Sequence, residues 1–202
     1  MLKSSLTRTL AVAAMGITAV LGGWASVATA APAMGEPAAM VAAEPVYEAF
    51  TVLNGGKNLA SNSSGIAVAS PGQTNDQRQQ WERRVAGNVA PKVGFSKPYQ
   101  IRNSFTGLCL RDVGDGFPAV EQACDTNLTS KSPQLWHEHV AVDRVVNGLP
   151  FRFQFNRASG RVLSQAPEFG TAVPVLSSPK ATNDLSAAAA LQLWWIRPAS
   201  LT

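Results

Sequence analysis

The sequence predicts an all-β domain of three similar lobes, and the prediction rests on a repeated motif and on the order of the segments around it. The tripeptide Gln-x-Trp occurs three times, at Gln79–Trp81, Gln134–Trp136 and Gln192–Trp194, with spacings of 55 and 58 positions. Each copy ends a segment that contains an alternating, aromatic-led run, a turn from Asn to Gly and short apolar runs. Repetition at a near-constant period indicates one supersecondary unit that buries its apolar face only against the other copies.

The segments within the repeats are typical of strands. The alternating runs that open the three lobes are residues 47–52, 99–105 and 151–155. Alternation of this kind predicts a strand with one buried face. Residues 66–68 and 173–176 are short β-branched runs bounded by Gly, Pro and Ser, which also predict strands. Residues 184–191 favour a helix of one or two turns, because they contain four consecutive alanines, and this insertion lengthens the loop before the third Gln-x-Trp.

The first thirty residues predict a secretory signal peptide. Lys3 and Arg8 form a basic start, residues 10–22 are apolar, and Ala28-Thr29-Ala30 is a small-residue cleavage pattern. The alternative is an uncleaved membrane anchor, but the segment consists mostly of Ala, Gly, Ser and Thr, which drive insertion weakly. We therefore expect a secreted, extracellular protein with no membrane span after signal removal.

The mature chain predicts a short leader and one folded domain. Residues 31–45 are rich in Ala, Pro and Met without a usable period, which indicates a disordered leader. The remaining residues, 46–198, have the usual size of one domain with a single core. We expect a monomer whose lobes span about residues 46–90, 91–145 and 146–198.

Charge and cysteine content narrow the class of protein. Removal of Lys3 and Arg8 lowers the formal net charge from +4 to +2, and the remaining cations are scattered. A nucleic-acid partner is not expected, because such proteins usually carry a stripe of cations or a recognisable reading helix. Cys109 and Cys124 lie in one repeat of an exported chain, which favours a disulfide over two free thiols or a metal site.

The second lobe resembles one repeat of the ricin B-type lectin family. The resemblance rests on the order of Tyr99–Asn103, Gly107–Leu110, Val120–Cys124 and Gln134–Trp136. It covers about residues 47–197 and is looser in the other two lobes. The resemblance implies a β-trefoil, in which hairpins close a barrel that three further hairpins cap.

The repeated Gln and Trp residues are more consistent with structure than with ligand contact. One Trp per lobe can bury a large area around a pseudo-threefold axis, and its neighbouring Gln can satisfy backbone groups at the end of the lobe. We therefore assign structural roles to Gln79, Trp81, Gln134, Trp136, Gln192 and Trp194.

A sugar site of the family type is expected to be degenerate here. In sugar-binding members, an acid stands two residues after the first cysteine position, an aromatic residue shortly precedes the second, and Asn precedes the Gln of Gln-x-Trp. The acid positions of this sequence are Ala60, Arg111 and Ser164, and the Asn positions are Arg78, Pro133 and Leu191. Asp112 is the acid nearest to any of these positions and lies one residue after Arg111. A shift of one residue in a strand turns a side chain to the other face, unless a bulge turns it back.

Any surviving sugar site is predicted in the second lobe. Asp112 would accept hydrogen bonds from sugar hydroxyls, Gln122 and Asn127 would donate and accept, and Phe117 or His137 would stack on the ring. The alternative is that Asp112, Asp115 and Asn127 cap surface turns. The first and third lobes are expected to be scaffold.

Catalysis is not expected, and neither is a cofactor or a metal. His137 and His139 lie on one face of a strand with Glu138 pointing away, so a third metal ligand is missing and surface histidines are the simpler interpretation. The sequence has no Gly-x-Ser-x-Gly, paired-carboxylate motif or phosphate-binding glycine loop.

Two functions remain. The first is a secreted, non-catalytic, lectin-like protein that binds a carbohydrate. The second is a trefoil that has lost sugar binding and contacts or inhibits a protein target through loops, for which residues 87–97 and 179–190 are the candidates.

Overall fold

The computed structural model describes residues 46–146, 149–168, 170–183 and 186–199, which form twelve strands, one short 3₁₀ helix and one short α-helix. The predicted signal peptide, residues 1–30, and the predicted leader, residues 31–45, lie outside the described residues. Among the described residues, no helix has the length and apolar character needed to cross a bilayer.

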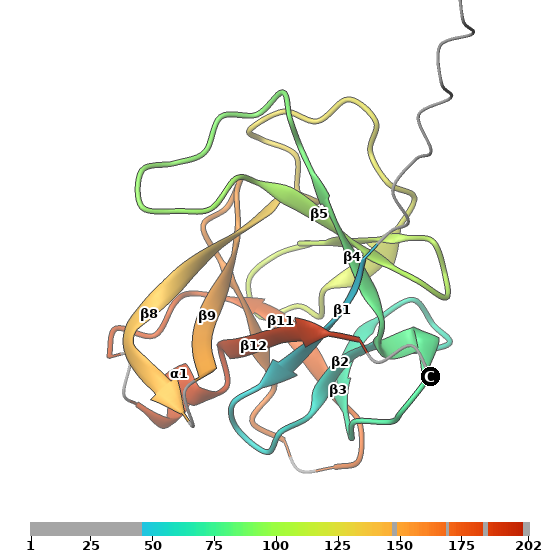
Figure 1. Cartoon of the computed structure of the whole chain (residues 1–202), viewed down its shortest axis with the longest axis vertical. Helices are drawn as coiled ribbons and strands as arrows, with labels where there is room; N and C mark the ends of the chain where they lie inside the picture. The colour runs from blue at the N-terminus through green and yellow to red at the C-terminus, as the bar shows by residue number, and fades with distance from the viewer. Residues whose placement is uncertain (1–45, 147–148, 169, 184–185, 200–202) are drawn as a thin grey trace, which may run out of the picture. The chain divides into compact units, whose positions relative to one another are not determined.

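Six strands pair in a ring that closes a barrel, and they can be followed in Figure 1. They are β1 (Tyr47–Val52), β4 (Trp81–Val85), β5 (Tyr99–Asn103), β8 (Trp136–Val146), β9 (Leu149–Asn156) and β12 (Leu193–Pro198). Each pairs antiparallel with the next in this order, and β12 pairs with β1 to complete the ring. Because the ring is closed, its strands leave no free edge for pairing with another chain.

Three hairpins cap the barrel. They are β2 (Asn58–Ser61) with β3 (Ala67–Ser70), β6 (Cys109–Arg111) with β7 (Val120–Gln122), and β10 (Val162–Gln165) with β11 (Val173–Ser178). The hairpins also contact one another in pairs, through bridges Ile66–Val120 and Pro118–Leu176 and through the pairing of β11 with β3. This is a β-trefoil with lobe one at β1–β4, lobe two at β5–β8 and lobe three at β9–β12, so the predicted fold class is confirmed.

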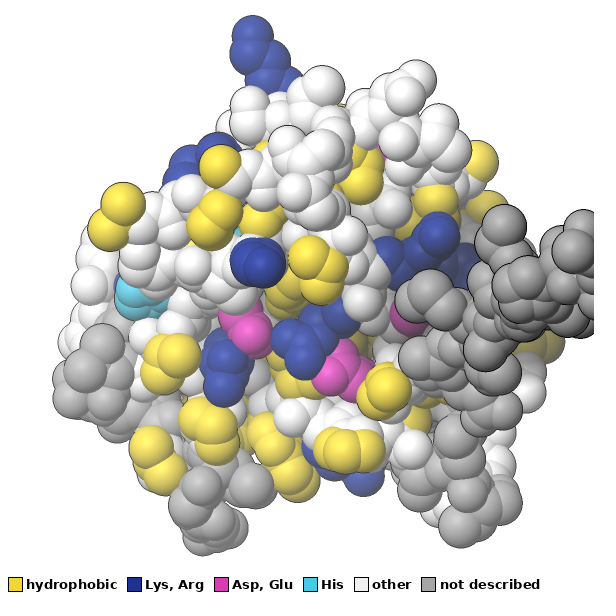
Figure 2. All heavy atoms as spheres, turned by 45° about the horizontal axis from the view of Figure 1, so that its top comes forward, with side chains coloured by type: hydrophobic (Ala, Val, Ile, Leu, Met, Phe, Trp, Pro, Cys, Tyr) yellow, Lys and Arg dark blue, Asp and Glu magenta, His cyan; other side chains and the backbone are white. Residues whose placement is uncertain are grey.

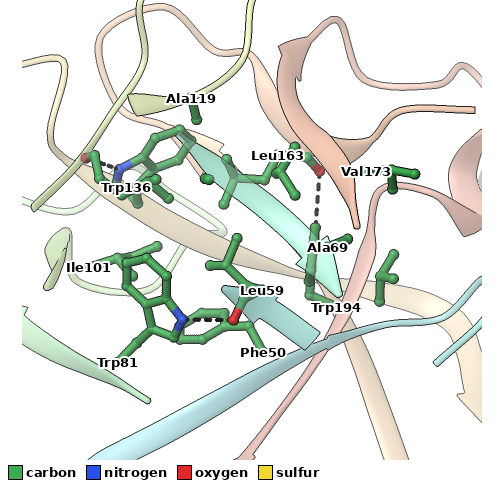
Figure 3. Close-up of a cluster of buried hydrophobic side chains, with 14 of the residues drawn as sticks. Phe50, Leu59, Ala69, Trp81, Ile101, Ala119, Trp136, Leu163, Val173 and Trp194 are labelled. Carbon is green, nitrogen blue, oxygen red and sulfur yellow. Dashed lines mark hydrogen bonds between the residues drawn. The ribbon is translucent and has the colours of Figure 1, made fainter. Parts of the chain in front are cut away.

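One Trp from each lobe fills the core (Figure 3). The indoles of Trp81, Trp136 and Trp194 are fully buried among Phe50, Ile101 and other apolar side chains. Their Nε1–H groups donate to the carbonyls of Leu59, Leu110 and Leu163 at 2.9, 3.0 and 3.0 Å. Each Trp therefore joins a barrel strand to the capping hairpin of its own lobe, and its truncation to Ala would cost about 3–5 kcal/mol.

The Gln of each Gln-x-Trp fastens the loop that precedes it. The side-chain amides of Gln79, Gln134 and Gln192 donate to the carbonyls of Pro71, Ala123 and Pro179 at 2.8, 2.7 and 2.8 Å. Their oxygens accept from the backbone N–H groups of Gln73, Asp125 and Ala181 at 3.0, 2.8 and 2.8 Å. All three amides are buried, so these bonds satisfy backbone groups that water cannot reach.

Three local features complete the fold. The predicted disulfide between Cys109 and Cys124 is present and ties β6 to the segment after β7. The alanine-rich insertion forms α1 (Ala187–Ala190), which is capped by Ser186, whose side chain accepts from the Ala189 N–H at 3.1 Å. The helix therefore has the short length that its sequence predicts. A 3₁₀ helix, η1 (Gln77–Gln79), precedes the first Gln-x-Trp tryptophan.

Candidate functional site

Three equivalent junctions join the lobes. Each is centred on the residue two positions after the leucine whose carbonyl accepts the Trp Nε1–H bond. These residues are Ser61 between lobes one and two, Asp112 between lobes two and three, and Gln165 between lobes three and one. The equivalence allows the three places to be compared side chain by side chain.

Asp112 closes the junction between lobes two and three. It is 5% exposed, and its carboxylate accepts from Ser159 Oγ, from Arg161 Nη2 at 2.9 Å and from the Gly114 N–H at 3.1 Å. Burial opposes ionisation, but the hydrogen bonds from Ser159, Arg161 and Gly114 outweigh it and hold the pKa of Asp112 below its usual value. The expectation that Asp112 receives sugar hydroxyls is therefore corrected, because its oxygens already bind lobe three.

The other residues of the predicted second-lobe site do not come together. Phe117 and Asn127 are exposed on separate loops, and Gln122 accepts a hydrogen bond from Arg111 Nη1 at 3.0 Å on the outer face of β7. His137 is 1% exposed and stacks on the ring of Phe95, with 4.2 Å between ring centroids. The structure thus leaves these side chains apart.

The position of His137 corrects a second expectation, that the two histidines lie on the surface. Burial, with Lys92 and Arg157 nearby, lowers the pKa of His137 to about 4. The ring is therefore a neutral, packed side chain at neutral pH and cannot stack on a sugar. Within the described residues, no group of three or more His, Cys, Asp or Glu side chains is placed to hold a metal ion.

The junction between lobes one and two is also filled. Glu121 is buried there, its backbone N–H donates to Gly65 O at 2.7 Å, and its carboxylate accepts from Thr106 Oγ1. Burial raises the pKa of Glu121, and the hydrogen bond from Thr106 opposes this shift only in part. A polar side chain therefore occupies this junction as well.

The junction between lobes three and one is open. Gln165 is 6% exposed, and its Oε1 has no hydrogen-bond partner among the described residues. A pocket of about 570 Å³ lies beside it, with walls that include Gly55 and Lys57 of the β1–β2 turn, Pro167 after β10, and Ala188 of α1. We call this the Gln165 pocket.

Small residues explain why this junction is open. The turn position before a glycine of positive φ is Thr106 in lobe two and Ser159 in lobe three, but Gly55 in lobe one. The hairpin position opposite the core leucine is Glu121 in lobe two and Ser177 in lobe three, but Ala69 in lobe one. Both polar side chains that reach this position in the other junctions are thus missing beside Gln165.

The pocket walls are fixed by backbone hydrogen bonds. The Gln165 N–H donates to Leu191 O at 2.8 Å, and the Asn54 N–H donates to Ala190 O at 3.1 Å, so α1 is fastened to both neighbouring lobes. Lys57 Nζ donates to Gly170 O at 2.6 Å across the rim. A preformed pocket of mixed polar and apolar lining is the usual form of a small-ligand site.

A second hollow of about 500 Å³ lies at β4 and β5, and its charges are already paired. Arg83 binds Glu48 and also Glu138, at 3.3 Å, and Arg152 binds Glu138 at 2.9 Å. Figure 2 shows the resulting alternation of basic and acidic side chains on this face. These ions compensate one another, but Glu138 Oε2 is buried and has no hydrogen-bond partner among the described residues, so this hollow also keeps one unmet acceptor.

Sequence reasoning missed the Gln165 pocket because it treated lobe three as scaffold. The family pattern directed attention to Ser164 and Leu191, which lack the acid and the amide of a family-type site. The available signal was the coincidence of Gly55 and Ala69 at positions where the other lobes carry longer polar side chains.

No family model and no curated protein sequence matches the chain. Solved structures do match it. The designed threefold-symmetric protein ThreeFoil gives a TM-score of 0.56 at 15% identity, covering 74% of this chain and 96% of that one. The SDF2-like protein from Arabidopsis thaliana gives 0.56 at 11% identity, covering 76% and 92%.

A third similar structure is the Polyporus squamosus lectin bound to a human-type influenza-binding epitope. Its TM-score is 0.52 at 16% identity, covering 76% of this chain and 49% of the lectin, so the chain spans about half of that protein. At these identities the similarities establish the β-trefoil fold. Membership of the ricin B-type family stays a prediction.

Proposed function

We propose that this chain is a secreted, non-catalytic, lectin-like protein that binds carbohydrate in the Gln165 pocket. One observation carries the proposal: of three equivalent lobe junctions, two are filled by bonded polar side chains, whereas the third holds a pocket of about 570 Å³ that Gln165 helps to line. Secretion rests on the predicted signal peptide of residues 1–30.

The lining of the pocket suits a saccharide. A sugar presents hydroxyl donors and acceptors around a ring whose C–H faces are apolar. Gln165 and Asn54 supply amide groups, while Pro167, Ala188 and Leu191 supply apolar surface. Gln165 Oε1 is buried without a partner among the described residues, so a ligand donor that reached it would recover about 1–3 kcal/mol on binding.

The fold supports the same class of ligand. The Polyporus squamosus lectin has this fold and was solved with a saccharide bound. The proposed site here differs from the predicted second-lobe site, because Asp112 is committed to Ser159 and Arg161. We therefore place the sugar between lobes three and one.

The test is a glycan and polysaccharide binding screen of residues 31–202 with the Cys109–Cys124 disulfide intact. Saturable binding is expected, and Gln165→Met should weaken it at least tenfold, since Met keeps the length of the side chain but removes its polar atoms. Lys131→Ala is the matched surface control, because Lys131 is exposed and lies in lobe two. Failure to bind any glycan, or binding untouched by Gln165→Met, would refute this site.

A protein target is the second candidate, favoured by one observation. Val93 is fully exposed in the loop between β4 and β5, and Lys92 and Lys97 flank it. An exposed apolar side chain on a loop held by a rigid barrel is typical of a protein contact. This hypothesis expects no glycan binding, and it expects Val93→Asp, but not Gln165→Met, to abolish binding of the target once that target is identified.

A further inference from the structure

We infer that Arg157 is the centre of a separate binding site for an oxyanion, such as a carboxylate, sulfate or phosphate group. The site lies outside the Gln165 pocket, and the inference does not depend on the proposed carbohydrate-binding function. Three features of the described residues carry it: a guanidinium without a partner, a hollow that this side chain lines, and an excess of positive charge around the hollow.

The first feature is the guanidinium of Arg157. It makes no hydrogen bond, ion pair or ring contact with any described residue, and its Nε is buried. Its terminal nitrogens, Nη1 and Nη2, also lack a partner among the described residues but have accessible surface, so the end of the fork is open to a ligand. The other arginines whose side chains the structure describes each have an acid, an amide or an aromatic ring as a partner.

Folding does not require a cation at this position. The carbonyl of the middle residue of each Gln-x-Trp accepts a hydrogen bond from the backbone of the next lobe around the ring. The donors are the N–H groups of Leu53, Ser104 and Arg157, at 2.8, 2.8 and 2.7 Å, so these three residues are equivalent. Leu53 packs against a buried apolar cluster, and Ser104 is short and uncharged. The threefold scaffold therefore does not explain the charge in lobe three.

The second feature is a hollow of about 380 Å³ that Arg157 lines. Its other walls come from the loop between β4 and β5, through Asn88, and from the segment between β7 and β8, through Thr129 and Ser130. Asn88 Nδ2 donates to Leu128 O at 2.9 Å and so joins the two segments, which Figure 1 shows at one end of the barrel. We call this the Arg157 hollow.

The lining offers hydroxyl donors beside the guanidinium. Thr129 Oγ1 accepts from the Lys131 N–H at 3.3 Å, which leaves its own hydrogen available, and Ser130 Oγ has no hydrogen bond to a described residue. Val89 and Leu128 add apolar surface, beside which charges attract more strongly than in water. Every oxygen of an oxyanion accepts hydrogen bonds, and the planar fork of an arginine matches two of them at once. The donor set therefore suits a carboxylate or sulfate better than a neutral or cationic group.

The third feature is the charge around the Arg157 hollow. Arg157 is the one ionic side chain among the described lining residues, and the exposed Lys131 follows the lining residue Ser130 in the chain. Burial lowers the pKa of His137 to about 4, and repulsion from Lys92 and Arg157 adds to the shift, which places both cations near the same ring. A hollow lined by one sign of charge raises the local concentration of the opposite ion, so an oxyanion would be attracted here.

The test is a titration of isotope-labelled residues 31–202, in the oxidised form, followed through the backbone amide signals in NMR spectra. Sodium sulfate, sodium acetate and sodium glucuronate would each be added at an ionic strength held constant with sodium chloride. The expected result is a saturable shift of the signals of Asn88, Ser130 and Arg157 with sulfate and with both carboxylates.

Three variants assign the binding to the guanidinium. Arg157→Gln should weaken it by about tenfold or more, because both the charge and the fork are removed. Arg157→Lys keeps the charge as a compact ammonium without the fork, and should retain part of the binding. Arg111→Gln is the matched control, because it makes the same change at an arginine that is bonded to Gln122, and it should leave the binding unchanged. Thermal melts check that each variant is folded.

The outcomes are distinct. Shifts that rise linearly with concentration and spread over the whole surface would overturn the inference, because they would report a general salt effect. Saturable binding that survives Arg157→Gln, or that falls equally in Arg111→Gln, would overturn the assigned site. Tighter binding of glucuronate than of acetate would identify the source of the oxyanion as an acidic sugar, and equal binding would identify a free anion; both results support the site. Gln165→Met should leave these shifts unchanged, so failure of this inference can be distinguished from failure of the proposed function.

Discussion

The substitution Gln165→Met should raise stability while it removes ligand binding. In the folded chain Gln165 is 6% exposed and its Oε1 has no partner among the described residues. Folding therefore removes the water that bonds this acceptor and does not replace it with a protein donor. Leaving an acceptor in this state costs about 1–3 kcal/mol. Met has nearly the same length and no strong acceptor, so the variant should gain about 1 kcal/mol.

Urea unfolding followed by tryptophan fluorescence measures this gain. Trp81, Trp136 and Trp194 are fully buried, so unfolding should change their emission. A gain of about 1 kcal/mol at an unchanged slope moves the midpoint up by roughly 0.5 M urea. The same gain raises Tm by roughly 2–4 °C for a domain of this size.

Gln134→Met is the matched control, because it makes the same chemical change at an amide whose bonds are made. Gln134 donates to Ala123 O at 2.7 Å and accepts from Asp125 N at 2.8 Å and from Gln100 Nε2 at 3.0 Å. Gln134→Met should lower the free energy of unfolding by about 2–3 kcal/mol, since it leaves the buried groups that bond the Gln134 amide unpaired. If Gln165→Met were destabilising to the same degree, Gln165 would be a structural amide and the argument for a vacant acceptor would fail.

Other properties of the fold can be tested in the same way. Asp112→Asn should lower the free energy of unfolding by about 2 kcal/mol at pH 7, because it leaves Arg161 uncompensated. This cost should shrink at low pH, where acid protonates Asp112 in the wild type below its depressed pKa. Urea midpoints of the wild type and the variant at pH 7 and pH 3 measure the cost at each pH. Because the pKa of His137 falls from 6.5 to about 4 on folding, stability should drop by up to about 3 kcal/mol between pH 6.5 and 4 and then level off, and His137→Phe should remove this portion of the pH dependence. Replacing Cys109 and Cys124 together by Ala should lower the free energy of unfolding by about 3 kcal/mol, and an equal midpoint for the oxidised wild type and this variant would contradict a stabilising disulfide.

The fold was predictable because its signals are local and repeated. Each Trp is fixed by burial and by one hydrogen bond to a leucine carbonyl of its own lobe, so the same tripeptide must recur in all three lobes. The cysteine pair and the four alanines of α1 are equally local, and both have the predicted form. Patterns of this kind can be read without knowing which lobes touch.

The candidate site was not predictable in the same way, because its residues are distant in the sequence. Asp112 was expected to face a sugar, but Arg161, in the next lobe, neutralises it. His137 was expected at the surface, but Phe95, far away on an irregular loop, covers it. Side-chain alternation along one strand cannot reveal which loop packs on that strand.

A threefold fold can hold a ligand where its symmetry is broken. The same backbone position carries Ser61, Asp112 and Gln165, and in two junctions neighbouring polar side chains fill the space beside it. In the third junction, Gly55 and Ala69 have no long polar side chain to fill that space, and the inserted helix α1 lines one side of it. A loss of side chains alone would leave a void that destabilises the core. Here α1 encloses the void on one side and the buried amide of Gln165 is retained beside it, so the void has a defined shape and one polar side. The unpartnered amide oxygen costs stability in the free protein, and a ligand donor that reached it would recover this cost, which is the relation that the proposed binding site requires.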